Sequence, residues 1–152
     1  RLQDAIDCRD REALRTAIED GTRANLTEEE LDPAKSALDA EDEKVRARTN
    51  LRRAMAGGDM NLLRAAIAEG EKAGLSAKEL GAARALLQDE DEKAAARDTA
   101  RKALEEAVAG RDVGRLRAAI RAGEAAGLEG CDLEAARQAL RAEEQKALAK
   151  KH

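Results

Sequence analysis

Apolar residues follow the spacing of helix faces along the chain, and one apolar pattern occurs three times. Leu51, Ala54 and Met55 illustrate it, because positions i, i+3 and i+4 lie on one face of an α-helix. Eight positions of the pattern reappear 49 residues later and again after 53 more. They are Leu2, Asp10, Leu14, Ile18, Gly21, Leu26, Leu31 and Leu38, then Leu51, Asp59, Leu63, Ile67, Gly70, Leu75, Leu80 and Leu87, and finally Leu104, Asp112, Leu116, Ile120, Gly123, Leu128, Leu133 and Leu140. A long period of this kind predicts a repeat architecture.

The second occurrence of the pattern predicts three antiparallel helical pieces. These pieces cover 50–57, 60–70 and 76–88. Gly57 and Gly58 end the first piece, and Asp59 is a suitable N-cap for the second. The second piece is short and has Leu63 and Ile67 on the face that we expect to be buried.

The start of the third piece carries the strongest local signal. Ser76 and Glu79 have the spacing of a capping box, and Thr27 and Glu30 repeat it in the first occurrence. The leucines on either side of each cap form a hydrophobic staple. These leucines are Leu26 and Leu31, Leu75 and Leu80, and Leu128 and Leu133. Glu129 replaces the cap in the third occurrence, so we expect that helix to start later or to fray.

One loop position is occupied by Asn25, Gly74 and Gly127 in the three occurrences. Glycine and asparagine best tolerate a left-handed backbone. We therefore expect a positive φ at this position each time.

Pro33 conflicts with a helix that begins after Thr27, because a proline in the second turn removes a hydrogen bond. The alternative is a start with Asp32 as the cap and Pro33 as the first helical residue. The matching positions of the other occurrences favour the earlier start, so we expect a bend or an irregular first turn near Asp32.

Charged segments follow the leucine that closes each of the first two occurrences. They are Glu41-Asp42-Glu43-Lys44 and Glu90-Asp91-Glu92-Lys93. No glycine or proline interrupts 38–56 or 87–109, so we expect both links to be helical and solvated on all sides. Asp42 and Arg46 have the i, i+4 order that favours an ion pair. The long helices would then run from about 27 to 57 and from about 76 to 110.

The two ends of each long helix cannot face one core. Leu38 and Leu51 are 13 positions apart and Leu87 and Leu104 are 17 apart, which rotates their faces by about 220° and about 260°. We therefore predict an all-α, elongated fold of three tandem helical repeats, in which alternating short and long helices form small three-helix modules joined by continuous polar helices. The predicted organisation is a first repeat at 1–40, a polar helical link at 41–49, a second repeat at 50–88, a second link at 89–100, and a third repeat with a C-terminal helix at 101–152.

The composition limits the partners of such a fold. The chain contains no Phe, Trp or Tyr, so its cores consist of aliphatic residues and alanine. Its net charge is −4, spread as −5 over 1–49, −1 over 50–98 and +2 over 99–152. Nucleic acid is a poor partner for an acidic chain without aromatic rings. The gradient is either drift on solvated faces or the basis of weak end-to-end self-association.

Compartment signals are sparse. No apolar run approaches the roughly 18 residues of a membrane-spanning helix, so we expect no membrane insertion. Cys8 and Cys131 lie in different repeats, which predicts two separate thiols, either in a reducing compartment or simply as small buried residues. We favour an intracellular location, in the cytoplasm or in an organelle such as the chloroplast.

Candidate chemical groups each have a structural explanation. We expect no role for the terminal His152, a packing role for Cys8 at the position of Gly57 and Gly110, and no reactive thiol at Cys131. The acidic triplets cannot close on one ion, since neighbours on a helix point about 100° apart. A weak anion or partner site is the alternative to a solvated face for the basic helix with Arg111, Arg115, Arg117 and Arg121. We therefore predict no catalytic residues, no cofactor, no metal and no enzyme activity.

The segment Leu104 to Gly123, LEEAVAGRDVGRLRAAIRAG, resembles the helix-turn-helix half of an ankyrin repeat, although the period differs and the threonine-proline-leucine-histidine turn is missing. The shared long helices are similar in principle to spectrin-type rods. Over its whole length the chain resembles Ala/Arg-rich helical-repeat arrays of large proteins from unicellular algae. That resemblance implies a linker or scaffold segment, and the chain looks like three units of a longer array.

The sequence therefore predicts a non-enzymatic helical-repeat scaffold or spacer that mediates protein–protein interaction. One alternative is an accessory or linker subunit of a large assembly, for example a chloroplast photosynthetic complex. The other is a helical bundle that binds a small apolar ligand.

Overall fold

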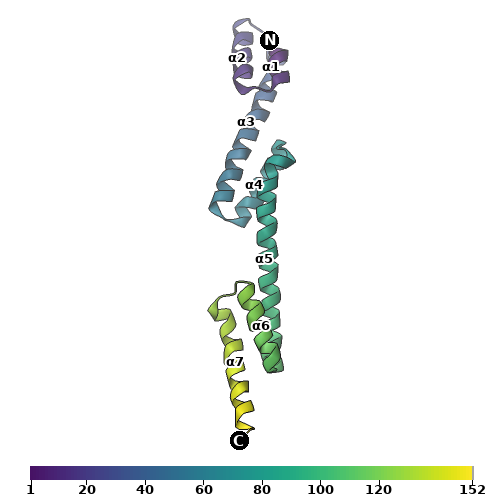
Figure 1. Ribbon diagram of the computed structural model, residues 1–152. Coiled ribbons are helices and arrows are strands. Elements are labelled where there is room, and N and C mark those ends of the chain that lie inside the picture. The colour runs from purple at the N-terminus through teal and green to yellow at the C-terminus, as the bar shows by residue number, and fades with distance from the viewer. Residues whose placement is uncertain (152) are drawn as a thin grey trace. The chain divides into compact units, whose positions relative to one another are not determined.

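The computed structural model describes residues 1–151 and confirms the all-α prediction, since these residues form helices and connecting turns without a strand (Figure 1). The helices are α1 (Leu2–Cys8), α2 (Arg11–Arg23), α3 (Glu28–Gly57), α4 (Met60–Ala73), α5 (Ala77–Gly110), α6 (Val113–Ala125) and α7 (Gly130–Ala149). The chain forms two compact units, Arg1–Leu87 and Gln88–His152, and α5 runs through the boundary between them.

The first unit contains two separate hydrophobic clusters. In the first cluster, α1 and α2 pack against the beginning of α3, and Leu14 is fully buried. The second cluster joins the end of α3 to α4 and to the beginning of α5 around the buried Leu63 and Leu80. Leu38 packs against the first cluster, whereas Leu51, on the same helix, belongs to the second.

The second unit has one cluster, formed by the end of α5 with α6 and α7. Leu116 is fully buried at its centre, and Leu104 and Leu133 pack beside it from the flanking helices. Leu104 therefore serves this cluster, while Leu87, earlier on α5, packs against a cluster of the first unit. As predicted from the rotation between the leucines, the two ends of each long helix serve different clusters.

The predicted helix bounds agree with the structure to within a few residues. The two long helices, expected from 27 to 57 and from 76 to 110, are α3 and α5. In α3, Thr27 forms a complete capping box with Glu30. In α5, the Ser76 backbone N–H donates to the Glu79 carboxylate at 2.9 Å, and the Glu79 N–H donates back to the Ser76 hydroxyl at 3.3 Å.

One prediction about a helix start was wrong. Glu129 makes no side-chain cap, as expected, yet α7 begins at Gly130, the position equivalent to the first residue of α3 and of α5. The staple leucine Leu133 is buried and holds this start in place without a cap. The earlier start that we favoured for the first long helix is confirmed, because α3 begins at Glu28 after the Thr27 cap and contains Pro33. The bend near Asp32 stays a prediction.

Positive φ occurs at Asn25, Gly74 and Gly127, which confirms the predicted loop position. A second left-handed position recurs in the structure at the end of the first helix of each pattern. It is occupied by Arg9 with φ 51°, Gly58 with φ 71° and Arg111 with φ 49°. Arginine gives no sequence signal for this backbone, so only the glycine of this set could be recognised in advance.

The first charged link, 41–49, is not solvated on all sides, contrary to the prediction. Ala47 is buried in the second cluster, and the side chains of Glu41 and Lys44 are only 14% and 16% exposed. Lys44 lines a hollow with Ile6 and Ala37, so this part of α3 packs on α1. The link 89–100 is helical and mostly exposed.

Candidate functional site

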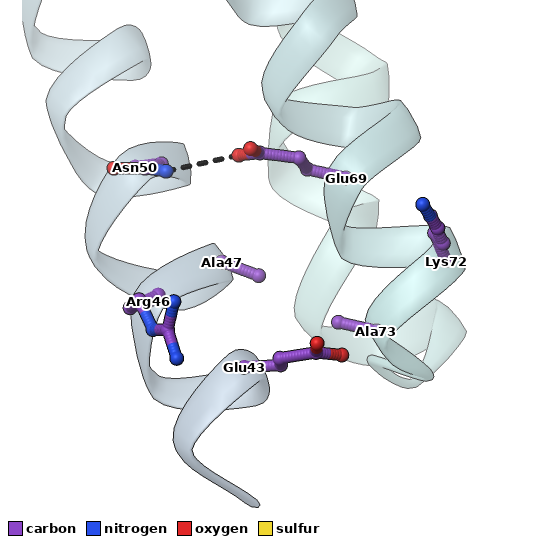
Figure 2. A pocket seen from close by; sticks show the side chains of 7 residues that line it. All are labelled: Glu43, Arg46, Ala47, Asn50, Glu69, Lys72 and Ala73. Atoms are coloured by element: carbon purple, nitrogen blue, oxygen red, sulfur yellow. Dashed lines mark hydrogen bonds between the residues drawn. The ribbon is translucent and has the colours of Figure 1, made fainter. Parts of the chain in front are cut away.

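A polar hollow lies between α3 and α4 in the first unit (Figure 2). Its volume is about 240 Å³. The lining residues are Glu43, Arg46, Ala47, Asn50, Glu69, Lys72 and Ala73. The Asn50 amide donates a hydrogen bond to the Glu69 carboxylate at 2.9 Å and spans the hollow at one end.

The charges of this hollow suit a polar partner. Figure 2 shows Glu43 directed toward Ala73, while Lys72 lies on the outer side of α4; Arg46 lines the hollow from α3. Two carboxylates and two cations so arranged can form hydrogen bonds and ion pairs with side chains of mixed charge. Periodicity did not identify this hollow, because it depends on which faces of α3 and α4 meet.

Two further hollows lie between the first and second helices of a cluster. One, of about 410 Å³, is lined by α1 and α2 and includes Asp4, Ala13 and Ala17. The other, of about 370 Å³, is lined by α5 and α6 and includes Glu106 and Arg115. The two linings occupy equivalent positions 102 residues apart, so the same surface feature is built twice.

In the first charged link, Asp42 pairs with arginines of the neighbouring helix α2. Asp42 accepts a hydrogen bond from Arg11 Nε at 2.6 Å and lies 3.8 Å from Arg15, so the expected partner Arg46 is wrong. At the positions of the second unit that are equivalent to Arg15 and Asp42, Arg117 donates a hydrogen bond to Glu144 at 2.6 Å. The packing of α2 on α3, and of α6 on α7, brings these charges together across 27 or 31 residues.

The arginines of the basic helix predicted at 111–121 lie in different surroundings. Arg117 is engaged by Glu144, and Arg115 lines the α5–α6 hollow. Arg111 holds the left-handed turn before α6 and lies near Glu143. These three arginines have different neighbours, and a weak anion or partner site on this helix stays a prediction.

A second recurring pairing joins the second helix of a cluster to the third. Glu71 accepts a hydrogen bond from Arg84, and Glu124 accepts one from Arg137 at 2.8 Å. These residues also occupy equivalent positions, 53 residues apart. All four are substantially exposed, so we assign them a modest energetic weight.

Among residues 1–151, three ionisable groups have pKa values that are resolved as shifted, and each shift has a local cause. The Ser76 backbone N–H, followed by the Arg48 guanidinium, holds the pKa of Glu79 down from 4.5 to about 2. A hydrogen bond to Asp89 raises the pKa of Lys93. A hydrogen bond from Lys146 lowers the pKa of Glu143.

Both cysteines are free and exposed, which corrects the prediction of small buried residues. A Cβ atom built on Gly57 or Gly110 would meet nothing within 4 Å, so the position of Cys8 does not require a small residue. His152 lies outside the described residues.

Within residues 1–151, no three His, Cys, Asp or Glu side chains are grouped so that they could hold a metal ion. No helix in that range has the length and hydropathy needed to span a bilayer. No known protein family, characterised protein or solved structure matches this chain.

Proposed function

We propose that the chain is a non-enzymatic helical-repeat scaffold or spacer that binds proteins along its surface. It would consist of three tandem modules in an elongated arrangement, with the boundaries 1–40, 50–88 and 101–152 and helical links at 41–49 and 89–100. The observation that carries the proposal is that α3 and α5 each contribute buried residues to two different hydrophobic clusters. A chain built in this way becomes longer with each added module, whereas a domain with a single core stays compact as it grows.

Recurring contacts support this organisation. The pair Lys44–Glu41 in the first link has counterparts in Lys93–Glu90 and in Lys146–Glu143, at 2.9, 2.9 and 2.8 Å. The pairs Arg48–Glu79 and Arg101–Asp132 recur in the same way. Repetition of side-chain contacts, and not only of residue types, is what tandem copies of one structural unit produce.

Small-angle scattering of the chain over a concentration series tests the proposal. A compact protein of 152 residues has a radius of gyration of about 15 Å. We expect a clearly larger value for the monomer and a distance distribution with a long tail. A radius near the compact value would contradict the spacer function, because the modules would then form one globule. Growth of the particle along its length with concentration would support the end-to-end association suggested by the charge gradient.

Binding along the surface is tested separately by two-hybrid or proximity-labelling capture, followed by purification of each captured protein and a direct titration. The polar hollow gives the matched variants. Lys72→Glu reverses a cation of this hollow, and Lys78→Glu makes the same change on the exposed first turn of α5. A partner held by the hollow should lose affinity only with Lys72→Glu.

A further inference from the structure

Leu62 projects from a position where the equivalent residues of the other clusters line hollows. Its side chain is 60% exposed, and it lies at the start of α4. The equivalent residues are Ala13, in the α1–α2 hollow, and Arg115, in the α5–α6 hollow. An exposed leucine therefore stands at this edge of the second cluster, which we call the raised edge, whereas Ala13 and Arg115 line hollows at the equivalent positions.

The α5–α6 hollow has an apolar floor and a charged rim. Ala107 and Ala119 are buried at its base, and Ala118 borders it from α6. Glu106 and Arg115 provide one charge of each sign, and neither side chain takes part in an ion pair among residues 1–151. Its volume of about 370 Å³ lies in the range of pockets that hold small ligands, so it has room for a leucine side chain.

The charges around Leu62 are complementary to this rim. Arg53 occupies the position equivalent to Glu106, so the raised edge carries a cation where the hollow carries an anion. Glu69 lies seven residues after Leu62 and hence on the same face of α4. Its carboxylate is held by Asn50 through one oxygen, which leaves the other for a second partner.

We propose that the chain binds a second copy of itself through these two surfaces. The Leu62 side chain of one copy enters the α5–α6 hollow of the other, where Arg53 meets Glu106 and Glu69 meets Arg115. Each copy carries one raised edge and one hollow, so the contact is heterologous, with different surfaces on the two partners. The contact rests on individual surfaces within each unit and is independent of the elongated arrangement.

The α1–α2 hollow is the less suitable acceptor. Its residue equivalent to Arg115 is Ala13, which offers no cation to Glu69. The opposite signs on both sides of the rim therefore distinguish the α5–α6 hollow.

One leucine and two exposed ion pairs make a small interface, so the association should be weak and visible only at high protein concentration. Sedimentation equilibrium up to millimolar protein should show the average mass rising above the monomer value of 16.3 kDa. Leu62→Ala should weaken the association at least about tenfold. Leu148→Ala, which removes the other large exposed leucine, should leave it unchanged.

Exchanging the charges of one proposed ion pair is the decisive test of the contact. Arg53→Glu and Glu106→Arg should each weaken association when studied alone. An equimolar mixture of the two variants should regain it, because the altered edge of one chain then fits the altered hollow of the other. Asp4→Arg is the matched control and should have no effect.

A native chain that stays monomeric at every concentration would overturn the proposal. So would equal losses from Leu62→Ala and Leu148→Ala, or a mixture that fails to recover. None of these results touches the scaffold function, since an extended monomer that binds other proteins would still support it. Association along the length of the particle that survives Leu62→Ala would be the end-to-end mode instead.

Discussion

At the scale of single residues, close helix contact depends on a glycine that recurs in each cluster. A Cβ atom on Gly21, Gly70 or Gly123 would lie 2.7, 2.8 or 2.7 Å from a leucine Cδ2 of the following helix. In the second cluster this leucine is Leu80, which is 1% exposed and cannot move out toward solvent. The glycine therefore sets the distance between α4 and α5.

Gly70→Ala should destabilise the chain although alanine is the better helix former. Replacing a helical glycine with alanine gains about 1 kcal/mol, whereas overpacking of a filled core costs about 1–3 kcal/mol. Gly81→Ala is the matched control in α5, because its Cβ would meet nothing within 4 Å, and it should stabilise by about 0.5–1 kcal/mol. Urea unfolding followed by circular dichroism measures both. Equal stabilisation by the two changes would show that the α4–α5 contact has room to spare.

At the scale of helices, most starts and ends could be predicted from sequence, because their signals are local. The capping boxes at Thr27 and Ser76 and the loop glycine at Gly74 each fix the backbone within a few residues. The left-handed turns at Arg9 and Arg111 escaped prediction, since arginine is not selected for that backbone. We therefore expect these turns to depend on the packing of the helices that they join.

Side-chain partners across helices could not be predicted in the same way. Asp42 was assigned to a neighbour one turn away, but the packing of α2 on α3 offers it Arg11 and Arg15. The exposure of Cys8 likewise depends on which face of α1 is covered. The sequence offered one signal for such pairs, because Arg15 and Asp42 recur 102 residues later as Arg117 and Glu144. This recurrence identifies an ion pair only when the packing of the helices is known.

The start of α5 should depend on pH in acid. The pKa of Glu79 is about 2 in the folded chain against 4.5 as its ordinary value, so its stabilising contribution is complete above pH 4.5 and is lost as the pH falls toward 2. Glu79→Gln should remove this part of the dependence, because the amide oxygen still accepts from the Ser76 N–H but does not titrate. Thermal unfolding between pH 5 and pH 2 compares the two chains. Parallel curves over this range would mean that Glu79 titrates normally in the folded chain.

At the scale of the whole molecule, α5 is the element that both compact units contain. It provides Leu80 to the last cluster of the first unit and Leu104 to the cluster of the second. A helix is cooperative along its length, because interrupting it requires two new ends. Destabilising one unit should therefore lower the stability of the other, because the helical residues 88–99 connect them.

Ala95→Pro should uncouple the two units without disturbing either cluster. Ala95 is exposed in the middle of this helical stretch, and a proline there removes a backbone hydrogen bond and costs about 3 kcal/mol. Leu116→Ala, which should cost about 2–5 kcal/mol in the second unit, then serves as the perturbation. Amide hydrogen exchange in α4 is the readout, since α4 lies wholly in the first unit.

In the native background, Leu116→Ala should lower the protection of α4 amides, and in the Ala95→Pro background it should not. Ala77→Pro is the matched control, because proline is accepted at the first position of a helix, and coupling should persist in it. If Leu116→Ala leaves the hydrogen-exchange protection of α4 unchanged in the native background, the units are energetically independent and α5 only connects them. If it responds equally in the Ala95→Pro background, the coupling passes through contacts other than the helix. Only loss of the response with Ala95→Pro and its retention with Ala77→Pro identifies the unbroken backbone of α5 as the route.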